Sequence, residues 1–162
     1  MKQRILISLM LSLLLIVPAA SAGCINVTET LLEFNGTDGV FTVYYDIDIL
    51  PKIYIMAFGG ANIVPEVEEQ FASFDKEDVR IKRLDYERAV VVVKDVSFYN
   101  KGYYFHNPHN FGMNLTKLVV DPPDNLPRTY LNTNSTRSIF YKDGPELNGT
   151  LPANNSLLAD FR

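Results

Sequence analysis

The sequence predicts an α+β fold, a mostly antiparallel β-sheet with one short packed helix, and a β-sandwich with a small helix is the alternative. Three observations carry this prediction. Apolar and polar residues alternate over residues 40–50, residues 89–93 form a continuous apolar run, and helical spacing of apolar residues is confined to residues 65–74. These patterns indicate a strand with one buried face, a fully buried strand and one amphipathic helix.

The first pair of strands is predicted between residues 25 and 50. Residues 25–34 are rich in β-favouring side chains, and the NGTDG stretch at 35–39 has the chemistry of a hairpin turn. In the second strand, alternation divides the side chains into two sets, one buried and one facing water. The buried set is Phe41, Val43, Tyr45, Ile47 and Ile49; the water-facing set is Thr42, Tyr44, Asp46 and Asp48.

A third strand and the helix follow. Pro51 is expected to end the second strand, and KIYIMAF at 52–58 resembles a short buried strand that two glycines terminate. The helix begins near Pro65, a residue suited to the first turn, and three glutamates then lie near the positive end of the helix dipole. Its apolar face is expected to consist of Val67, Phe71 and Phe74.

The remaining strands are predicted from short apolar stretches between turn signals. We expect strands within residues 78–84 and 88–99, and a last hairpin within 129–141. Asparagine, glycine and proline mark turns or connections at 100–102, 106–110 and 121–127.

The two ends of the chain have a different character from the middle. Lys2 and Arg4 precede an apolar run from Ile5 to Val17, and Ala20-Ser21-Ala22 follows, which is the layout of a secretory signal peptide. We therefore expect a signal peptide at 1–22, a single extracytoplasmic domain at 23–141, and an exposed, poorly ordered tail at 142–162. A retained signal anchor is the alternative, although the apolar run is shorter than the ~20 residues of a membrane-spanning helix.

Cys24, the only cysteine of the chain, lies just after this segment. The stretch Ser21-Ala22-Gly23-Cys24 resembles the lipobox of prokaryotic lipoproteins, which implies that the thiol of Cys24 receives a lipid and that the protein is held on the outer face of the cytoplasmic membrane. The competing prediction is an ordinary signal-peptidase cut after Ala22. An unpaired thiol in an exported protein is usually modified, which favours lipidation.

Glycosylation is the second modification that the sequence predicts. The sequon N-x-[S/T] occurs six times, whereas chance would give about one or two matches in a chain of this composition. The six asparagines are Asn26, Asn35, Asn114, Asn134, Asn148 and Asn154. Sequon glycosylation is typical of eukaryotes and archaea and lipoboxes of prokaryotes, so an archaeal cell-surface protein would satisfy both motifs.

Charge and motifs restrict the classes of function. The chain has 15 Lys and Arg against 19 Asp and Glu, and an acidic surface disfavours nucleic acid as a partner. No nucleotide-binding, hydrolase or zinc-protease signature occurs in the sequence, and we expect no cofactor and no catalytic residue.

Two groups of residues are candidates for chemistry or recognition. Asp46 and Asp48 share one strand face and are candidates for cation binding or acid–base chemistry, but alternating acids more often mark the water-facing side of a strand. Residues 97–112 contain both histidines of the chain and many aromatics, a mixture suited to carbohydrate or protein recognition. The alternative is a hairpin whose rings pack on the sheet. The candidate binding residues are Tyr99, Tyr103, Tyr104, His106 and His109.

Two classes of function follow from these observations. The first is a non-enzymatic surface lipoprotein and glycoprotein, a binding or structural module whose partners are the membrane, surface proteins or envelope polysaccharide. The second is an exported hydrolase or metal-binding protein that uses Asp46 and Asp48, or His106 and His109.

Overall fold

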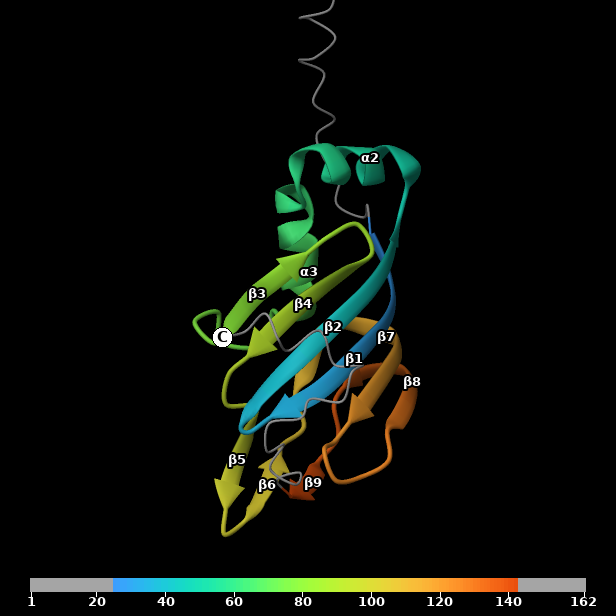
Figure 1. Cartoon of the computed structure of the whole chain (residues 1–162). Coiled ribbons are helices and arrows are strands. Elements are labelled where there is room, and N and C mark those ends of the chain that lie inside the picture. The colour runs from blue at the N-terminus through green and yellow to red at the C-terminus, as the bar shows by residue number, and fades with distance from the viewer. Residues whose placement is uncertain (1–24, 143–162) are drawn as a thin grey trace, which may run out of the picture.

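The computed structural model describes residues 25–142, which form two β-sheets and two short α-helices (Figure 1). Within them, the larger sheet has six strands in the order β3-β4-β2-β1-β7-β8, and the smaller has three in the order β5-β6-β9. The pairing is antiparallel except between β1 and β7, which run parallel. The prediction of an α+β fold dominated by antiparallel sheet is confirmed.

The elements follow one another with short connections. The strands of the larger sheet are β1 (Ile25–Asn35), β2 (Asp38–Ile47), β3 (Val79–Leu84), β4 (Arg88–Val93), β7 (Asn110–Asp121) and β8 (Arg128–Ser135). The strands of the smaller sheet are β5 (Ser97–Asn100), β6 (Tyr103–His106) and β9 (Ile139–Lys142). Between β2 and β3 lie α2 (Ile49–Phe58), a single 3₁₀ turn (Ala61–Ile63) and α3 (Val64–Gln70).

The core lies between one face of the larger sheet and α3. Val67 of α3 is buried, as the helical spacing predicts, and so is Phe71, the C-cap residue of the helix. Phe74, predicted on the same helix face, lies beyond the end of α3 and is half-buried. Phe71 meets Phe41 of β2 and Phe111 of β7 edge-on at ring-centroid distances of 5.2 and 6.4 Å. Edge-to-face packing of this kind stabilises aromatic clusters beyond their buried area. The buried amide of Gln70 adds a polar tie, because its nitrogen donates a hydrogen bond of 2.9 Å to the hydroxyl of Thr30.

A glycine allows α3 to approach the sheet closely. A methyl group at Gly112 of β7 would overlap the carbonyl oxygen of Glu69 in α3, so only glycine fits this crossing. The hydroxyl of Ser73, just after the helix, also donates a hydrogen bond to the backbone carbonyl of Asn110. The two contacts fix the end of α3 against the start of β7.

The predicted strand at 52–58 is wrong, because this segment belongs to α2. Strand β2 ends at Ile47, and Asp48 is the N-cap of a helix in which Pro51 occupies the first turn. Proline is tolerated there because that backbone nitrogen has no partner within the helix. Ile49, predicted to share the buried face of β2, is instead an exposed residue of α2.

The predicted water-facing set of β2 also needs a correction. Asp46 and Asp48 are exposed, but Thr42 is only 2% exposed. Its neighbours in register are Leu31 of β1 and Val90 of β4. Because β2 is an interior strand flanked by apolar neighbours, its second face is not uniformly wet.

Two expected strand arrangements differ in the structure. The segment 88–99 is divided into β4 and β5 by a turn at Asp95, whose φ is 51°. The expected final hairpin does not form, since β8 pairs with β7 in the larger sheet and β9 pairs with β6 in the smaller. Lys142, assigned to the tail from the sequence, is the last residue of β9. Strand β7 was not among the segments that the sequence identified.

Candidate functional site

The smaller sheet presents an outward surface of aromatic side chains, which we call the aromatic face. Phe98, Phe105 and Phe140 occupy directly opposed positions on β5, β6 and β9, so their side chains project from the same side of the sheet. Two residues further along β6, Tyr103 lies on this side as well. The aromatic face is therefore Phe98, Tyr103, Phe105 and Phe140.

The rings of the aromatic face contact one another and remain open to solvent. Phe98 packs against Phe105 with centroids 5.2 Å apart, and Tyr103 stacks on Phe140 at 4.8 Å. Phe98 is nevertheless 50% exposed and Phe140 56% exposed. The ammonium of Lys142 lies 5.1 Å from the centroid of the Tyr103 ring, which adds a cation at the border of the surface.

The other side of the smaller sheet faces the body of the protein. Tyr99, Tyr104 and Tyr141 are opposed across β5, β6 and β9, and the ring of Tyr104 is stacked on that of Tyr141 at 5.2 Å. Tyr141 is buried and donates a hydrogen bond of 2.9 Å to the carbonyl of Gly36 in the β1–β2 turn. The structure therefore separates the predicted contact residues: Tyr103 belongs to the aromatic face, whereas Tyr99 and Tyr104 lie on the opposite side.

Phe98 and Phe140 were not among the residues singled out in the sequence. These two residues can be identified from the strand register, because residues at opposed positions on the three strands share a face of the sheet. Phe140 lies 28 residues after the end of the 97–112 segment in the sequence, and only the pairing of β9 with β6 brings it there.

His106 is a buried structural residue whose two ring nitrogens both have partners. Nδ1 lies 2.8 Å from the carbonyl oxygen of Val96, so it carries the proton and donates it. Nε2 then accepts a hydrogen bond from the hydroxyl of Thr136 at 2.9 Å. The same hydroxyl oxygen accepts the backbone N–H of His109 at 2.8 Å. Burial lowers the pKa of His106 to about 4, so the ring is neutral at pH 7.

His109 is half-buried and stacks on an aromatic ring. Its imidazole lies over Phe74 with centroids 5.0 Å apart, and it is 5.3 Å from the ring of His106. Across residues 25–142, no three His, Cys, Asp or Glu side chains come together in a way that would hold a metal ion. The histidine pair and the Asp46–Asp48 pair each lack the third ligand that a zinc or calcium site needs there.

A second acidic pair, missed in the sequence, lies within the larger sheet. Glu33 of β1 and Asp121 of β7 are opposed in the parallel register. Burial raises the pKa of the Glu33 carboxyl, and the charge of Asp121 raises it further. The two carboxylates come from strands far apart in the sequence, so no local sequence pattern predicts that they are neighbours.

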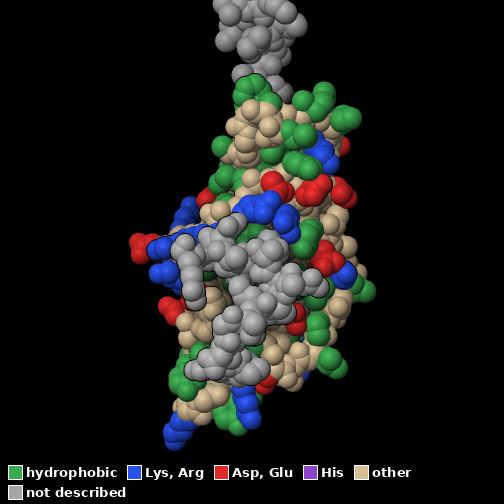
Figure 2. All heavy atoms as spheres, viewed as in Figure 1, with side chains coloured by type: hydrophobic (Ala, Val, Ile, Leu, Met, Phe, Trp, Pro, Cys, Tyr) green, Lys and Arg blue, Asp and Glu red, His purple; other side chains and the backbone are tan. Residues whose placement is uncertain are grey.

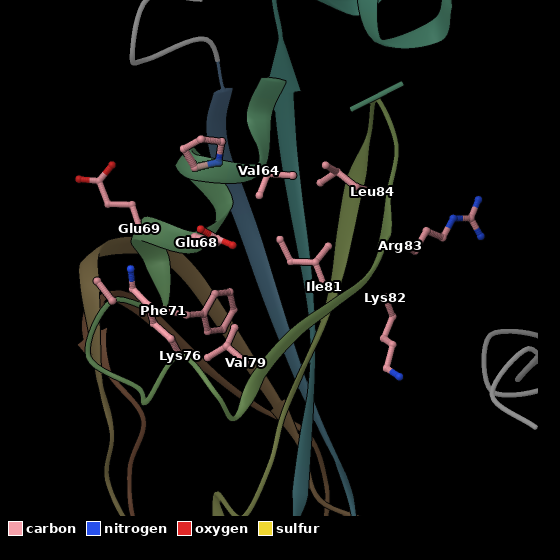
Figure 3. Close-up of a pocket in the computed structure, with 12 residues that line it drawn as sticks. Val64, Glu68, Glu69, Phe71, Lys76, Val79, Ile81, Lys82, Arg83 and Leu84 are labelled. Carbon is pink, nitrogen blue, oxygen red and sulfur yellow. The ribbon is translucent and has the colours of Figure 1, made fainter. Parts of the chain in front are cut away.

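An open groove of about 630 Å³ runs between α3 and the edge strand β3 (Figure 3). Its apolar floor includes Phe71, Val79 and Ile81, while its rim carries charges of both signs. The lining holds no His, Cys, Ser or Thr side chain, and its charged residues are Glu68, Glu69, Lys76, Lys82 and Arg83.

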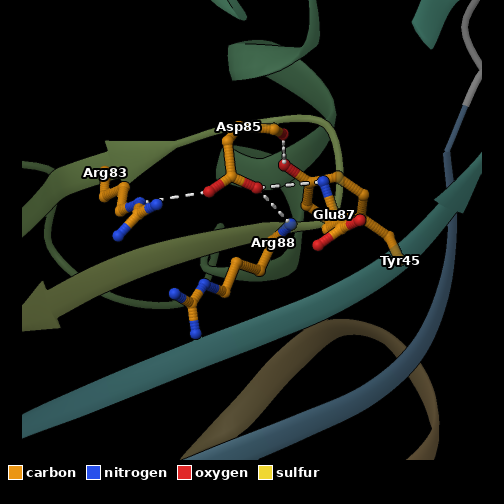
Figure 4. A network of polar contacts seen from close by, with 5 residues as sticks. All are labelled: Tyr45, Arg83, Asp85, Glu87 and Arg88. Atoms are coloured by element: carbon orange, nitrogen blue, oxygen red, sulfur yellow. Dashed lines mark hydrogen bonds and ion pairs between the residues drawn. The ribbon is translucent and has the colours of Figure 1, made fainter. Parts of the chain in front are cut away.

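The turn that follows β3 is fixed by one carboxylate (Figure 4). Oδ1 of Asp85 accepts the backbone N–H groups of Glu87 and Arg88, both at 3.0 Å, and Oδ2 accepts Arg83 Nε at 3.0 Å. The hydroxyl of Tyr45 donates to the carbonyl of Asp85 at 2.6 Å, and burial raises the pKa of this phenol. The role of this polar network is therefore structural, because its hydrogen bonds close the β3–β4 hairpin.

The predicted modification sites divide between described and undescribed residues. Asn26, Asn35, Asn114 and Asn134 are all exposed, which a glycan requires. Cys24, Asn148 and Asn154 lie outside the described residues, as do the predicted signal peptide and tail. Among the helices that the structure describes, none has the length and apolar character to cross a membrane.

Comparisons with protein-family models, with curated proteins and with solved structures give no match for this chain. The site therefore has to be interpreted from its own geometry.

Proposed function

We propose that this protein is a non-enzymatic binding module of the cell surface, exported and held at the membrane by a lipid on Cys24. The aromatic face is its contact surface, and the partner is a surface protein or polysaccharide of the envelope. The observation that carries the proposal is the outward exposure of Phe98 and Phe140 on one side of the smaller sheet. On the other side Tyr141 is buried against the body of the protein, and Tyr99 on the edge strand β5 is 55% exposed.

The position of the aromatic face supports this function. In Figure 1 the smaller sheet lies at one end of the molecule, whereas the start of β1, the first described residue after Cys24, lies toward the other end. An anchor on Cys24 would therefore leave the smaller sheet, with its aromatic face, at the end of the molecule farther from the membrane. Exposed aromatic rings with few rotatable bonds are favourable anchors for recognition, because they bury large areas at small entropic cost.

The experiment is a binding measurement with the cell envelope of the source organism. Changing Phe98 and Phe140 to alanine is expected to weaken binding of the purified protein about 30-fold or more, which corresponds to the ~2 kcal/mol typical of an interface anchor. The matched control is Leu131→Ala, which truncates an exposed apolar side chain on β8 instead.

The fold and the partner class are tested in the same experiment. Thermal unfolding of the Phe98→Ala, Phe140→Ala protein is expected to stay close to that of the parent, because both rings are half-exposed. Protease or periodate treatment of the envelope separates a protein from a polysaccharide partner. Unchanged binding in the double variant, or catalytic turnover that disappears in Asp46→Asn or His106→Ala, would contradict the proposal.

A further inference from the structure

Helix α2 exposes an apolar surface to solvent. Ile49, Leu50, Ile53, Met56 and Phe58 are between 57% and 75% exposed, and Ile55 alone among the ten residues of the helix is buried. At 100° per residue, the five exposed side chains cover about half of the helix circumference. A surface helix of a globular protein normally has the reverse arrangement, with polar residues outward.

The helix has little charge of its own. Lys52 is its single charged residue, and its ammonium lies at the flank of the apolar surface, 4.7 Å from the centroid of the Tyr86 ring. Asp46 and Asp48 are exposed just before the helix. The space-filling view shows hydrophobic side chains gathered at this end of the molecule (Figure 2). Contiguous apolar patches of this type usually mark a contact with a membrane or another protein.

The strand register places this surface beside the point where the N-terminal segment enters the domain. Ile25 pairs with Ile47, two residues before α2 begins, and the backbone N–H of Ile25 donates to a carboxylate oxygen of Glu66 at 3.1 Å. Figure 1 shows α2 at the end of the molecule where β1 begins. Cys24 is the residue bonded to Ile25 in the sequence, so an anchor on Cys24 would attach at this end of β1.

The sequence before Ile25 indicates what covers the apolar surface. It contains the apolar run Ile5–Val17 and the proposed lipid site Cys24, and both belong in a bilayer. With an acyl group on Cys24, as the proposed function has it, or with the apolar run retained, the membrane surface would begin next to α2. A single acyl chain binds membranes only weakly, and stable attachment requires a second signal.

We propose that α2 lies in the membrane interface and embeds Ile49, Leu50, Ile53, Met56 and Phe58 among neutral lipids, as the second membrane signal beside the N-terminal anchor. The proposal extends the surface-lipoprotein function and rests on its export to the membrane. Attraction is apolar rather than electrostatic, because the helix has one cation and acidic neighbours. With α2 in the interface, the aromatic face points away from the bilayer.

The absence of tryptophan from the sequence permits a site-specific test. The protein is prepared from Gly23 onward with Cys24→Ser, so that no lipid is attached, and a single tryptophan is introduced as Phe58→Trp in α2. On addition of phosphatidylcholine vesicles, its fluorescence is expected to shift to the blue. The matched control is Phe98→Trp, on the aromatic face, whose emission is expected to stay unchanged.

Vesicle flotation provides the quantitative test. Replacing Ile53, Met56 and Phe58 by serine is expected to lower the vesicle partition coefficient about 100-fold or more, since three apolar side chains lose their lipid contact. Replacing Leu126 and Leu131, which are equally exposed elsewhere, by serine is expected to leave it unchanged. Circular dichroism verifies that both variants remain folded.

Two results would overturn the proposal. One is a Phe58→Trp emission that vesicles do not move. The other is a blue-shifted emission without vesicles together with a dimer in sedimentation, because a second copy of the chain would then be what covers α2. Neither readout involves acylation or the aromatic face, so failure of the proposed function and failure of this inference are distinguishable.

Discussion

Among single residues, His106 links the two sheets through hydrogen bonds. Its ring joins Val96, which precedes β5, to Thr136, which precedes β9, and Thr136 in turn holds the backbone of His109. Of the two histidines that the sequence suggested as metal ligands, His106 therefore has a structural role. A buried imidazole with both nitrogens satisfied stabilises the fold only while it is neutral.

We expect the stability of the protein to fall in mild acid because of His106. Its pKa is about 4 in the folded state, below the ordinary value of 6.5, so the unfolded chain takes up a proton first as the pH falls. The stabilisation is complete above about pH 6.5 and is lost progressively between that pH and about 4, by up to about 3 kcal/mol. Denaturant unfolding at pH 7, 5.5 and 4 measures it.

The variant His106→Asn keeps a donor for the Val96 carbonyl but does not titrate in this range. Its free energy of unfolding is expected to be lower than that of the parent at pH 7, and this difference in free energy is expected to become smaller toward pH 4. The matched control is His109→Gln, which changes the half-buried neighbour and is expected to keep most of the pH dependence, because burial rather than His109 is the larger cause of the lowered pKa of His106. Parallel pH profiles for the parent and His106→Asn would rule out this account.

At the level of elements, the contact of α3 with β7 depends on the absence of a side chain at Gly112. Replacing this glycine by alanine forces the helix backbone away from the sheet, because the methyl group meets the carbonyl of Glu69 rather than a flexible side chain. We expect a loss of about 1–3 kcal/mol in the free energy of unfolding, the usual range for overpacking. Denaturant titration of Gly112→Ala measures it.

Thr116→Ala is the control for that experiment, because Thr116 is an exposed residue of the same strand. A surface change of this kind is expected to alter stability by less than about 0.5 kcal/mol. Equal stability of Gly112→Ala and the parent would show that α3 does not need its close approach to β7.

For the whole molecule, the proposals give a consistent orientation. In the proposed orientation an anchor on Cys24 and helix α2 would meet the membrane, and the smaller sheet lies at the end of the molecule away from α2 (Figure 1). The four described sequon asparagines are exposed. Glycans at these positions would lie on the acidic body of the protein, where they would favour solubility outside the cell.

Intact mass spectrometry of the protein from its own host tests the two predicted modifications together. A mature chain that begins at Cys24 with added acyl mass, and that becomes unmodified in Cys24→Ser, is the expected result for the anchor. For the glycans, each Asn→Gln change at a used sequon is expected to remove one glycan mass. Asn134→Gln is preferred to Thr136→Ala, because the Thr136 hydroxyl also binds His106. A bare polypeptide mass would end both predictions.

The sequence alone determined the local features of this fold. Alternation identified β2 and its buried residues Phe41, Val43 and Tyr45, and Pro65 with the following apolar spacing identified α3. These features depend on the periodicity of one segment, which is visible in that segment itself. A signal peptide, lipidation and glycosylation are also inferred from local motifs, and they stay predictions.

Only the tertiary structure decided the remaining features. A short apolar run such as 52–58 fits a buried strand or a helix, and the choice depends on whether another strand is available to pair with it. β8 and β9 join different sheets because β7 and β6 bind them from elsewhere in the chain. The same long-range pairing leaves Phe98 and Phe140 exposed and Tyr141 buried. The alternation along a strand decides which side chains share a face, but residues distant in the sequence decide which of the two faces is buried.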